Sequence, residues 1–275
     1  MPAFSTITPE KLARLIGTPK APVILDVRDA DDLAAAPRLI PTAKVMLNTA
    51  VAEWGRAYAG QSVVVSCKRG KKLSEGVAAW LRHYGAAAEN LEGGTEAWVG
   101  AGLPMVPISA IPKANAAGAT VWVTRSRPKI DRIACPWLIR RFVDPEAVFL
   151  FVAAAEVEAV AERFAATPFD IEGVHWSHRG ELCTFDVMIE EFGLASGPLN
   201  RLATIVRGAD TARLDLAPEA AGLLAASLGL SRIYADDLEQ LDAGMTLYDA
   251  FYRWARDATD ETHNWPAHSP KGARP

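Results

Sequence analysis

The sequence predicts two domains of different fold class: an α/β domain, in which a mainly parallel sheet has helices on both faces, and then an α+β domain that is mostly helical. A length of 275 residues suits two domains. Short apolar runs alternate with helical patterns at first, whereas later apolar residues recur mostly with helical spacing. The predicted ranges are 1–104 for the first domain, 105–120 for a linker, 121–257 for the second domain and 258–275 for a flexible tail.

The first domain is predicted from short apolar strands that alternate with helices. Val63–Ser66 is the clearest buried strand, because strands covered on both faces are continuously apolar. After it, apolar residues recur with a 3.6-residue period, which predicts a helix. Strands are expected at Val23–Val27, Val45–Leu47, Val63–Ser66 and Glu89–Leu91, and helices or helical turns at Asp31–Ala36, Val51–Ala57, Glu75–Tyr84 and Thr95–Ala101.

The second domain begins with apolar strands and then reads almost entirely as helix. Before it, Leu103–Thr120 contains several prolines and an Ala/Gly run, which is typical of a linker without strands. Gly193, Gly229 and Gly244 predict helix stops or kinks. Strands are expected at Val121–Thr124, Val148–Val152, Phe169–Ile171 and Val174–Ser177, and helices at Asp131–Val143, Glu156–Ala165, Thr184–Phe192, Leu199–Gly208, Pro218–Leu228 and Ala235–Asp257.

Cys67 lies where a buried strand ends and a helix begins, a position that favours a reactive thiol. The first turn of a helix offers unpaired N–H groups and about half a positive charge. Four cationic residues follow the cysteine closely: Lys68, Arg69, Lys71 and Lys72. Both effects lower a thiol pKa and attract anionic substrates. The alternative is a buried cysteine that only packs, the commoner fate of a lone cysteine.

Four segments, the Cys67 loop included, resemble in order the signatures of the rhodanese family of sulfurtransferases. The other three are Val23–Arg28, which ends in the family's Asp-Val-Arg, Leu39–Ala43, a variant of its His-Ile-Pro-Gly-Ala segment, and Leu91–Trp98, close to its closing Gly-Gly-x-x-x-Trp. The resemblance implies an enzyme that needs no cofactor and moves sulfur from thiosulfate or a similar donor to a thiol acceptor. It implies that Cys67 is catalytic and forms a persulfide.

The resemblance also implies roles for the neighbours of Cys67. Substrate would be bound by Lys68, Arg69, Gly70, Lys71 and Lys72, and the loop would be supported by Asp26 and Arg28.

The chain departs from the rhodanese pattern at two positions. Lys72 ends the loop where rhodaneses usually carry Arg, and Leu39 replaces the usual His. Lysine keeps the charge but loses the planar fork of arginine, so the preferred sulfur donor stays open. Related phosphatases need an Arg one position further along, where this chain has Leu73, and a phosphatase is therefore not expected.

Residues 121–257 resemble the C-terminal domain of the bacterial chromate-resistance regulator family. The matching segments are Trp122–Arg125, Pro128–Phe142, Phe169–Ile171, Ser177–Gly180, Val206–Thr211 and Asp215–Pro218. Regulators of this family carry a DNA-binding-type N-terminal domain, whereas this chain has its rhodanese-like domain there. The resemblance implies an association with chromate resistance and assigns no reaction to the second domain.

One short stretch of the second domain gathers possible metal ligands, namely His175, His178, Glu181 and Cys183. In a strand the two histidines would face opposite sides, whereas in a turn they could converge. His178 is the stronger candidate, because it lies in a segment that resembles the family. The alternative is a hydrogen-bonded surface turn. Further carboxylates could come from Asp210, Asp236 and Asp237, although each also suits a helix N-terminus.

A group of basic residues offers a second kind of site, because arginine forks match tetrahedral oxyanions such as chromate or sulfate. Its members are Arg125, Arg127, Lys129, Arg132, Arg140 and Arg141. Basic residues are usually solvated, so the alternative is an exposed face or ion pairs with Asp131, Asp144 and Glu146.

These patterns together predict a metal or oxyanion site that contains His178, a carboxylate from Asp210 or another acid at a helix end, and Arg132 nearby. Divalent iron, manganese or zinc would each accept mixed histidine and carboxylate ligands. Cys135 lies in an apolar helical pattern and is expected to pack in the core.

The composition argues against several classes of protein. A net charge of −4 gives no reason to expect nucleic-acid binding. The sequence contains no apolar run of transmembrane length, and its start has neither a basic region nor a hydrophobic signal core. We therefore expect no membrane association and no secretory peptide. Three widely spaced cysteines predict a reducing cytoplasm rather than a disulfide framework.

Two classes of function remain. The first is a cytoplasmic sulfurtransferase whose second domain binds a metal or an oxyanion. The second is a non-catalytic binding protein that senses redox state and chromate. A steady-state sulfurtransferase assay separates them, because a sensor needs little turnover.

Overall fold

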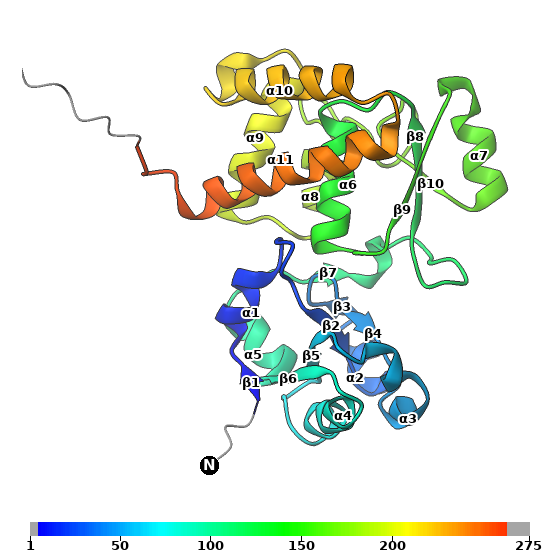
Figure 1. The fold of residues 1–275 in the computed structure, drawn as a ribbon, viewed down its shortest axis with the longest axis vertical. Coiled ribbons are helices and arrows are strands. Elements are labelled where there is room, and N and C mark those ends of the chain that lie inside the picture. The colour runs from blue at the N-terminus through cyan, green and yellow to red at the C-terminus, as the bar shows by residue number, and fades with distance from the viewer. Residues whose placement is uncertain (1–4, 263–275) are drawn as a thin grey trace, which may run out of the picture.

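The first domain is built on a five-stranded parallel sheet, in a computed structural model that describes residues 5–262 (Figure 1). The strand order is β1 (Thr6–Ile7), β6 (Ala87–Leu91), β5 (Ser62–Ser66), β2 (Val23–Asp26) and β4 (Lys44–Val45). All neighbouring strands run parallel, so each connection crosses a face of the sheet. The predicted α/β class is confirmed.

Helices cover both faces of this sheet, because alternate residues of each strand point to opposite sides. In β5, Val64 belongs to the same buried cluster as Leu12 of α1 and Trp98 of α5, whereas Val65 clusters with Leu81 of α4. The helices are α1 (Pro9–Leu15), α2 (Ala30–Ala35), α3 (Val51–Trp54), α4 (Lys72–His83) and α5 (Gly94–Gly100), with 3-10 turns η1 (Asn48–Ala50) and η2 (Gly55–Tyr58).

The segment predicted as a linker is partly ordered into the first domain, which corrects the expectation of a connection without strands. β7 (Val106–Pro107) pairs antiparallel with β3 (Arg38–Leu39), and the 3-10 turn η3 (Ile108–Ala110) follows it. Val106 is 1% exposed, so β7 is held both by its hydrogen bonds to β3 and by the burial of this side chain in the core. A strand of two residues is too short to show an alternating apolar pattern in the sequence. The prolines of this segment therefore led to the prediction of a linker without strands.

The second domain combines a small parallel sheet with a helical second half, as predicted. The sheet has the order β10 (Thr167–Pro168), β8 (Val121–Arg125) and β9 (Val148–Val152). The helices are α6 (Asp131–Phe142), α7 (Val157–Phe164), α8 (Thr184–Glu191), α9 (Gly197–Asp210), α10 (Ala220–Ile233) and α11 (Asp237–Asp257), with 3-10 turns η4 (Ala154–Glu156) and η5 (Leu214–Leu216).

Two details of the second domain correct the sequence prediction. Phe169–Ile171 and Val174–Ser177 are not strands; they meet only in an isolated bridge between Phe169 and Trp176. Gly229 and Gly244 lie within α10 and α11 and stop neither helix. Gly244 instead permits close packing, since a Cβ atom there would lie 2.5 Å from the Cγ2 atom of Ile133 on α6.

Helix α6 forms the centre of the second domain's core. Nine of its residues are buried, and Trp137 packs against Phe185, Tyr248 and Tyr252 from α8 and α11. Cys135 is fully buried on this helix, which confirms its predicted place in the core.

The two domains share one large buried cluster, which differs from the expected separation of their cores, whereas a second cluster on the α4 side of the first sheet stays within the first domain. A single buried cluster joins Leu12 and Ile24 of the first domain to Trp137 and Phe142 of the second. The Thr42 N–H donates a hydrogen bond to the Phe142 carbonyl across the interface, with an N···O distance of 3.0 Å. The composition of the linker predicted that the two domains pack independently, but apolar residues from the two domains pack against each other.

Among residues 5–262, no helix combines the length and the apolar character that a membrane crossing needs. The tail predicted at 258–275 falls for the most part outside this described range, because residues 263–275 are not described.

Candidate functional sites

Cys67 lies directly after β5, at the C-terminal edge of the parallel sheet, and α4 begins five residues later. This edge is where ligands bind in α/β sheets. The Cys67 Sγ atom lies 3.1 Å from the Ser74 hydroxyl. Burial acts to raise the pKa of the Cys67 thiol, but hydrogen bonds from the Ser74 hydroxyl and from the backbone N–H groups of Ser74, Lys71 and Arg69 outweigh it and lower the pKa. The arrangement favours a thiolate.

The loop that follows Cys67 is held from behind by the turn between β6 and α5. The Asn90 side chain donates to the Gly70 carbonyl at 2.7 Å, and the Thr95 N–H donates to the Cys67 carbonyl at 3.0 Å. Gly94 has a φ of +61°, and a Cβ atom there would lie 2.1 Å from the Cys67 carbonyl oxygen and 2.4 Å from the Gly70 nitrogen. The close approach of these two turns therefore requires a glycine.

The four cations of the loop are placed unequally. Lys68 forms a 2.8 Å ion pair with Asp32, and the Arg69 guanidinium lies 3.4 Å from Glu96. Lys71 and Lys72 are exposed and form no ion pair with any described residue. Their predicted role in substrate binding, like that of Lys68, Arg69 and Gly70, stays a prediction. The sequence pattern did not single out Ser74; its position in the first turn of the helix after Cys67 was the available signal.

Asp26 and Arg28 form a buried ion pair of 2.7 Å at the end of β2. The Arg28 guanidinium also donates to the carbonyls of Ala36 and Arg38. The pair therefore holds the chain between α2 and β3, and its expected support of the Cys67 loop stays a prediction. Two backbone acceptors outside the loop satisfy the buried guanidinium, which explains why Arg28 can be 6% exposed.

In the second domain, His178 faces three aspartates. Its Nε2 atom lies 3.2 Å from Asp210, 3.5 Å from Asp131 and 3.5 Å from Asp170. Contacts with Asp131, Asp170 and Asp210 raise the pKa of His178 to about 12, although burial opposes them. The histidine side chain is 40% exposed, so solvent reaches the cluster from its side.

Asp131 is the buried member of this cluster, with no exposed surface at the start of α6. Its Oδ2 atom accepts a 2.6 Å hydrogen bond from the Thr184 N–H, whereas its Oδ1 atom is buried and has no hydrogen-bond partner among the described residues. Burial raises the pKa of Asp131 to about 7 against the effect of His178. Ile130, just before it, has a φ of +26°, and Tyr248 bonds its carbonyl at 3.0 Å.

Asp170 links the cluster to Arg132. Its Oδ2 atom lies 3.2 Å from the Arg132 guanidinium, and its Oδ1 atom accepts a 2.9 Å hydrogen bond from the Thr184 hydroxyl. One possible ligand atom each from Asp131, Asp170 and His178 lie within 4.8 Å of one another, which is a spacing that could hold a metal ion. Asp210 and Arg132 stand beside this group, each in contact with one member of it.

Of the residues predicted for this site, the structure brings His178 and Asp210 together and places Arg132 on Asp170. The prediction omitted Asp131 and Asp170 as members of the site. In the sequence Asp131 has the place of an acid that favours a helix N-terminus, and Asp170 lies within Phe169–Ile171, which suggested a strand. The signal was that both acids occur in segments that resemble the chromate-resistance family.

The remaining candidate ligands lie elsewhere. His175 faces Glu191 at 3.8 Å and is 60% exposed, and Glu181 is exposed. The Cys183 thiol is buried and donates to Asp186 at the N-terminus of α8. Asp236 caps α11, and Asp237 accepts from the Arg127 N–H.

The basic group does not assemble into one pocket. Arg140 pairs with Asp242 at 3.4 Å and Arg141 with Asp249 at 2.8 Å. Arg140 and Arg141 thus form ion pairs, as the alternative interpretation expected. Their partners are acids of α11 and not the expected Asp131, Asp144 and Glu146.

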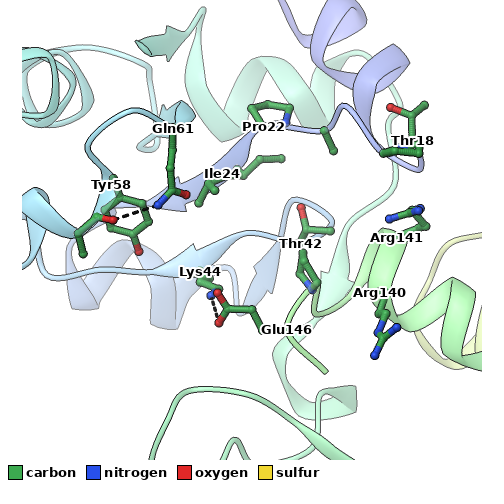
Figure 2. A pocket seen from close by; sticks show the side chains of 15 residues that line it. Thr18, Pro22, Ile24, Thr42, Lys44, Tyr58, Gln61, Arg140, Arg141 and Glu146 are labelled. Atoms are coloured by element: carbon green, nitrogen blue, oxygen red, sulfur yellow. Dashed lines mark hydrogen bonds and ion pairs between the residues drawn. The ribbon is translucent and has the colours of Figure 1, made fainter. Parts of the chain in front are cut away.

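A cavity of about 450 Å³ lies between the domains and is distinct from both clusters (Figure 2). Its walls include Pro22 and Gln61, which precede β2 and β5, and so it lies at the opposite edge of the sheet from Cys67. Figure 2 shows Lys44 and Glu146 facing each other beside it, where they form a 2.6 Å ion pair between the domains.

Comparisons with known proteins agree with both resemblances. Residues 8–101 match the family model of the rhodanese-like domain, and residues 122–255 match that of the ChrB C-terminal domain. Protein ChrB of Cupriavidus metallidurans is 34% identical over 132 residues, which cover 48% of this chain and 39% of that protein. The chain thus matches well under half the length of this curated relative.

Solved structures similar to the first domain include a rhodanese-related protein from Thermoplasma volcanium. It has 24% sequence identity and a TM-score of 0.33, and the match covers 38% of this chain and 98% of that chain. A thiosulfate sulfurtransferase from Pseudomonas aeruginosa has 29% identity and a TM-score of 0.32, with 38% of this chain and 20% of that chain covered. The family models and the observed sheet together show that the chain joins a rhodanese-like domain at residues 8–101 to a ChrB C-terminal domain at residues 122–255.

Proposed function

We propose that this protein is a sulfurtransferase that carries sulfur as a persulfide on Cys67. The observation that carries the proposal is the environment of Sγ, where backbone N–H groups and the Ser74 hydroxyl lower the thiol pKa in spite of burial. A thiolate is the nucleophilic form of cysteine. We propose the cytoplasm as the protein's location, because its reducing conditions would keep Cys67 free of a disulfide. The three free cysteines support that location.

The proposed reaction has two steps. The Cys67 thiolate attacks the outer sulfur of thiosulfate or a related donor; a new S–S bond forms, the S–S bond of the donor breaks, and sulfite leaves with the electron pair. The loop N–H groups stabilise the terminal sulfur anion of the persulfide. A thiol acceptor, as its thiolate, then takes the outer sulfur and releases the Cys67 thiolate.

The exposed ammonium groups of Lys71 and Lys72 support an anionic donor. In the proposal, they attract the sulfonate end of the donor while the thiolate attacks its outer sulfur. A lysine holds an oxyanion as a point charge and without the bidentate fork, so donor selectivity is expected to be broad.

The test is the mass of the intact protein after treatment with thiosulfate. The wild-type chain should gain the mass of one sulfur atom and lose it when a thiol is added. Cys67→Ser should gain nothing. Cys183→Ser is the matched control, since serine is a favoured N-cap in place of Cys183, and it should still gain one sulfur.

The resemblance of the second domain to chromate-resistance regulators favours a second candidate, a protein that senses chromate and redox state with little turnover. Steady-state thiocyanate formation from thiosulfate and cyanide separates the two candidates. Sustained turnover that Cys67→Ser abolishes supports the enzyme. A persulfide that forms once without turnover would support the sensor, and a persulfide retained in Cys67→Ser would exclude the assignment of Cys67.

A further inference from the structure

The carboxylates around His178 form a cluster of acidic side chains that the proposed sulfurtransferase function does not use. Asp131, Asp170 and Asp210 all face the imidazole, and the only cation paired with any of them, apart from the histidine, is Arg132 among the described residues. Three carboxylates thus face one imidazole and one guanidinium, so acidic side chains outnumber basic ones at this position. Such a set of side chains suits a divalent cation better than an oxyanion.

Asp131 supplies an independent sign of a missing ligand. One oxygen of its carboxylate accepts from the Thr184 N–H, but the other is buried without a partner among the described residues. A buried carboxylate oxygen without a hydrogen bond costs free energy, and native structures rarely leave one unpaired. The Oδ2 atom of the same carboxylate lies 3.5 Å from the His178 Nε2 atom, so a cation bound at the cluster would contact this buried, incompletely hydrogen-bonded group.

The distances within the cluster fit such an ion. Two ligand atoms bound about 2.1 Å from one cation lie roughly 3.0–3.4 Å apart when their bonds are perpendicular or tetrahedral. The Nε2 atom of His178 lies 3.5 Å from both Asp131 and Asp170. All three ligand atoms lie within 4.8 Å of one another, so adjustment of the side chains would let them share one ion.

We propose that Asp131, Asp170 and His178 bind one divalent transition-metal cation in the second domain. A single imidazole with two carboxylates suits manganese, iron or zinc better than magnesium, which prefers oxygen ligands and keeps its waters. Arg132 forms an ion pair with Asp170 and the Thr184 hydroxyl donates a hydrogen bond to it, so both orient one ligand. Asp210 contacts His178 from outside the ligand set, and the exposed side of His178 gives the ion access from solvent.

The site does not depend on Cys67, which lies in the other domain. Cys67→Ser should therefore bind the ion as the wild-type chain does, and failure of the sulfurtransferase proposal would leave this one standing.

The experiment uses the full chain, treated with a chelator and then titrated with Mn²⁺. Electron paramagnetic resonance should show one bound Mn²⁺ per chain, displaced by Zn²⁺ and not by a similar concentration of Mg²⁺. The melting temperature should rise with Mn²⁺ concentration and fall again with chelator. His178→Ala should weaken Mn²⁺ binding at least tenfold. His175→Ala, a neighbouring exposed histidine outside the cluster, should leave binding unchanged.

A ligand variant that keeps the backbone guards against misfolding. Asp170 has a φ of +51°, a conformation that asparagine also tolerates, so Asp170→Asn should fold and lose Mn²⁺ binding. Absence of bound metal at millimolar Mn²⁺ would overturn the proposal, as would equal affinity of wild type and His178→Ala. Stabilisation by sulfate or chromate in place of cations would assign the cluster to an anion instead.

Discussion

The Cys67 thiol differs from the two other thiols of the chain in what surrounds it. Burial raises the pKa of Cys135 and Cys183, and the nearby Asp131 carboxylate raises both further. Cys67 is also buried, but the Ser74 hydroxyl and three backbone N–H groups are directed at its sulfur and lower its pKa. Hydrogen bonds at short range thus decide which of the three thiols ionises most readily.

Removal of the Ser74 hydroxyl should raise the pKa of Cys67. Ser74→Ala deletes a donor that favours the thiolate, so the thiolate fraction at neutral pH falls and persulfide formation slows there, while the rate at alkaline pH is retained. The ultraviolet absorbance of the thiolate against pH measures this. Cys135 and Cys183 remain silent near neutrality, because their pKa values are raised.

Ser66→Ala is the control for this prediction, since the Ser66 hydroxyl donates to the Cys67 carbonyl and not to its sulfur. Its titration midpoint should match that of the wild type. An unchanged midpoint in Ser74→Ala would show that the backbone N–H groups alone set the pKa.

At the scale of elements, the Cys67 loop is shaped by a second turn that lies behind it. The turn between β6 and α5 places the backbone of Gly94 against the carbonyl of Cys67, and Asn90 at the end of β6 ties down Gly70. Parallel neighbours β5 and β6 end at the same edge of the sheet, and therefore these two turns must meet.

A methyl group at Gly94 should push the two turns apart. Gly94→Ala would need a left-handed φ and a Cβ atom 2.1 Å from the Cys67 carbonyl oxygen, so we expect a loss of roughly 2–4 kcal/mol of unfolding free energy. Persulfide formation should fall with it, because the N–H groups of the loop no longer converge. Urea unfolding and the thiosulfate mass assay measure the two effects.

Gly102→Ala is the matched control, as Gly102 has a φ of +69° and a methyl group added there would have nothing within 4 Å. It should cost about 1 kcal/mol and leave persulfide formation intact. Equal effects of the two substitutions would mean that backbone strain, and not the contact between turns, limits the loop.

At the scale of the whole molecule, the rhodanese-like and ChrB C-terminal domains form one packed unit. Figure 1 shows α11 and α6 of the second domain facing the part of the first domain that contains α1. Between them, Gly17 lies against the rings of Phe142 and Tyr252. Arg14 and Asp257 add an ion pair at the rim, 3.6 Å long and largely exposed on the arginine side.

Gly17→Ala tests whether this interface stabilises both domains together. Its Cβ atom would lie 2.4 Å from the Phe142 ring and 2.8 Å from Tyr252, so we expect a loss of about 2–4 kcal/mol in unfolding free energy. Calorimetry should show a single transition that moves to lower temperature. Gly60→Ala has the same φ of +77° with open space around it, and it should cost only about 1 kcal/mol. Two separate transitions in wild type would show that the domains unfold independently.

Local features of the chain were predictable because they depend on neighbours in sequence. The apolar run of β5, the start of a helix after Cys67 and the helical half of the second domain all rest on periodicities and caps within a few residues. The position of Cys67 at the edge of the sheet therefore follows from the sequence alone. The segment signatures likewise indicated which two domains are joined.

Tertiary structure alone decided what converges from distant parts of the chain. Asp131 begins α6, Asp170 follows β10, His178 lies in the loop before α8 and Asp210 ends α9, and packing of these elements brings the four side chains together. The buried cluster that the two domains share also results from tertiary packing. Burial stabilises contact between two apolar surfaces regardless of the segment, here residues 105–120, that connects them in sequence. Sequence determined most of the elements and the position of Cys67 between a strand and a helix. The Asp131 oxygen without a partner among the described residues and the fit of Gly17 against Phe142 exist only after non-local packing has fixed their neighbours.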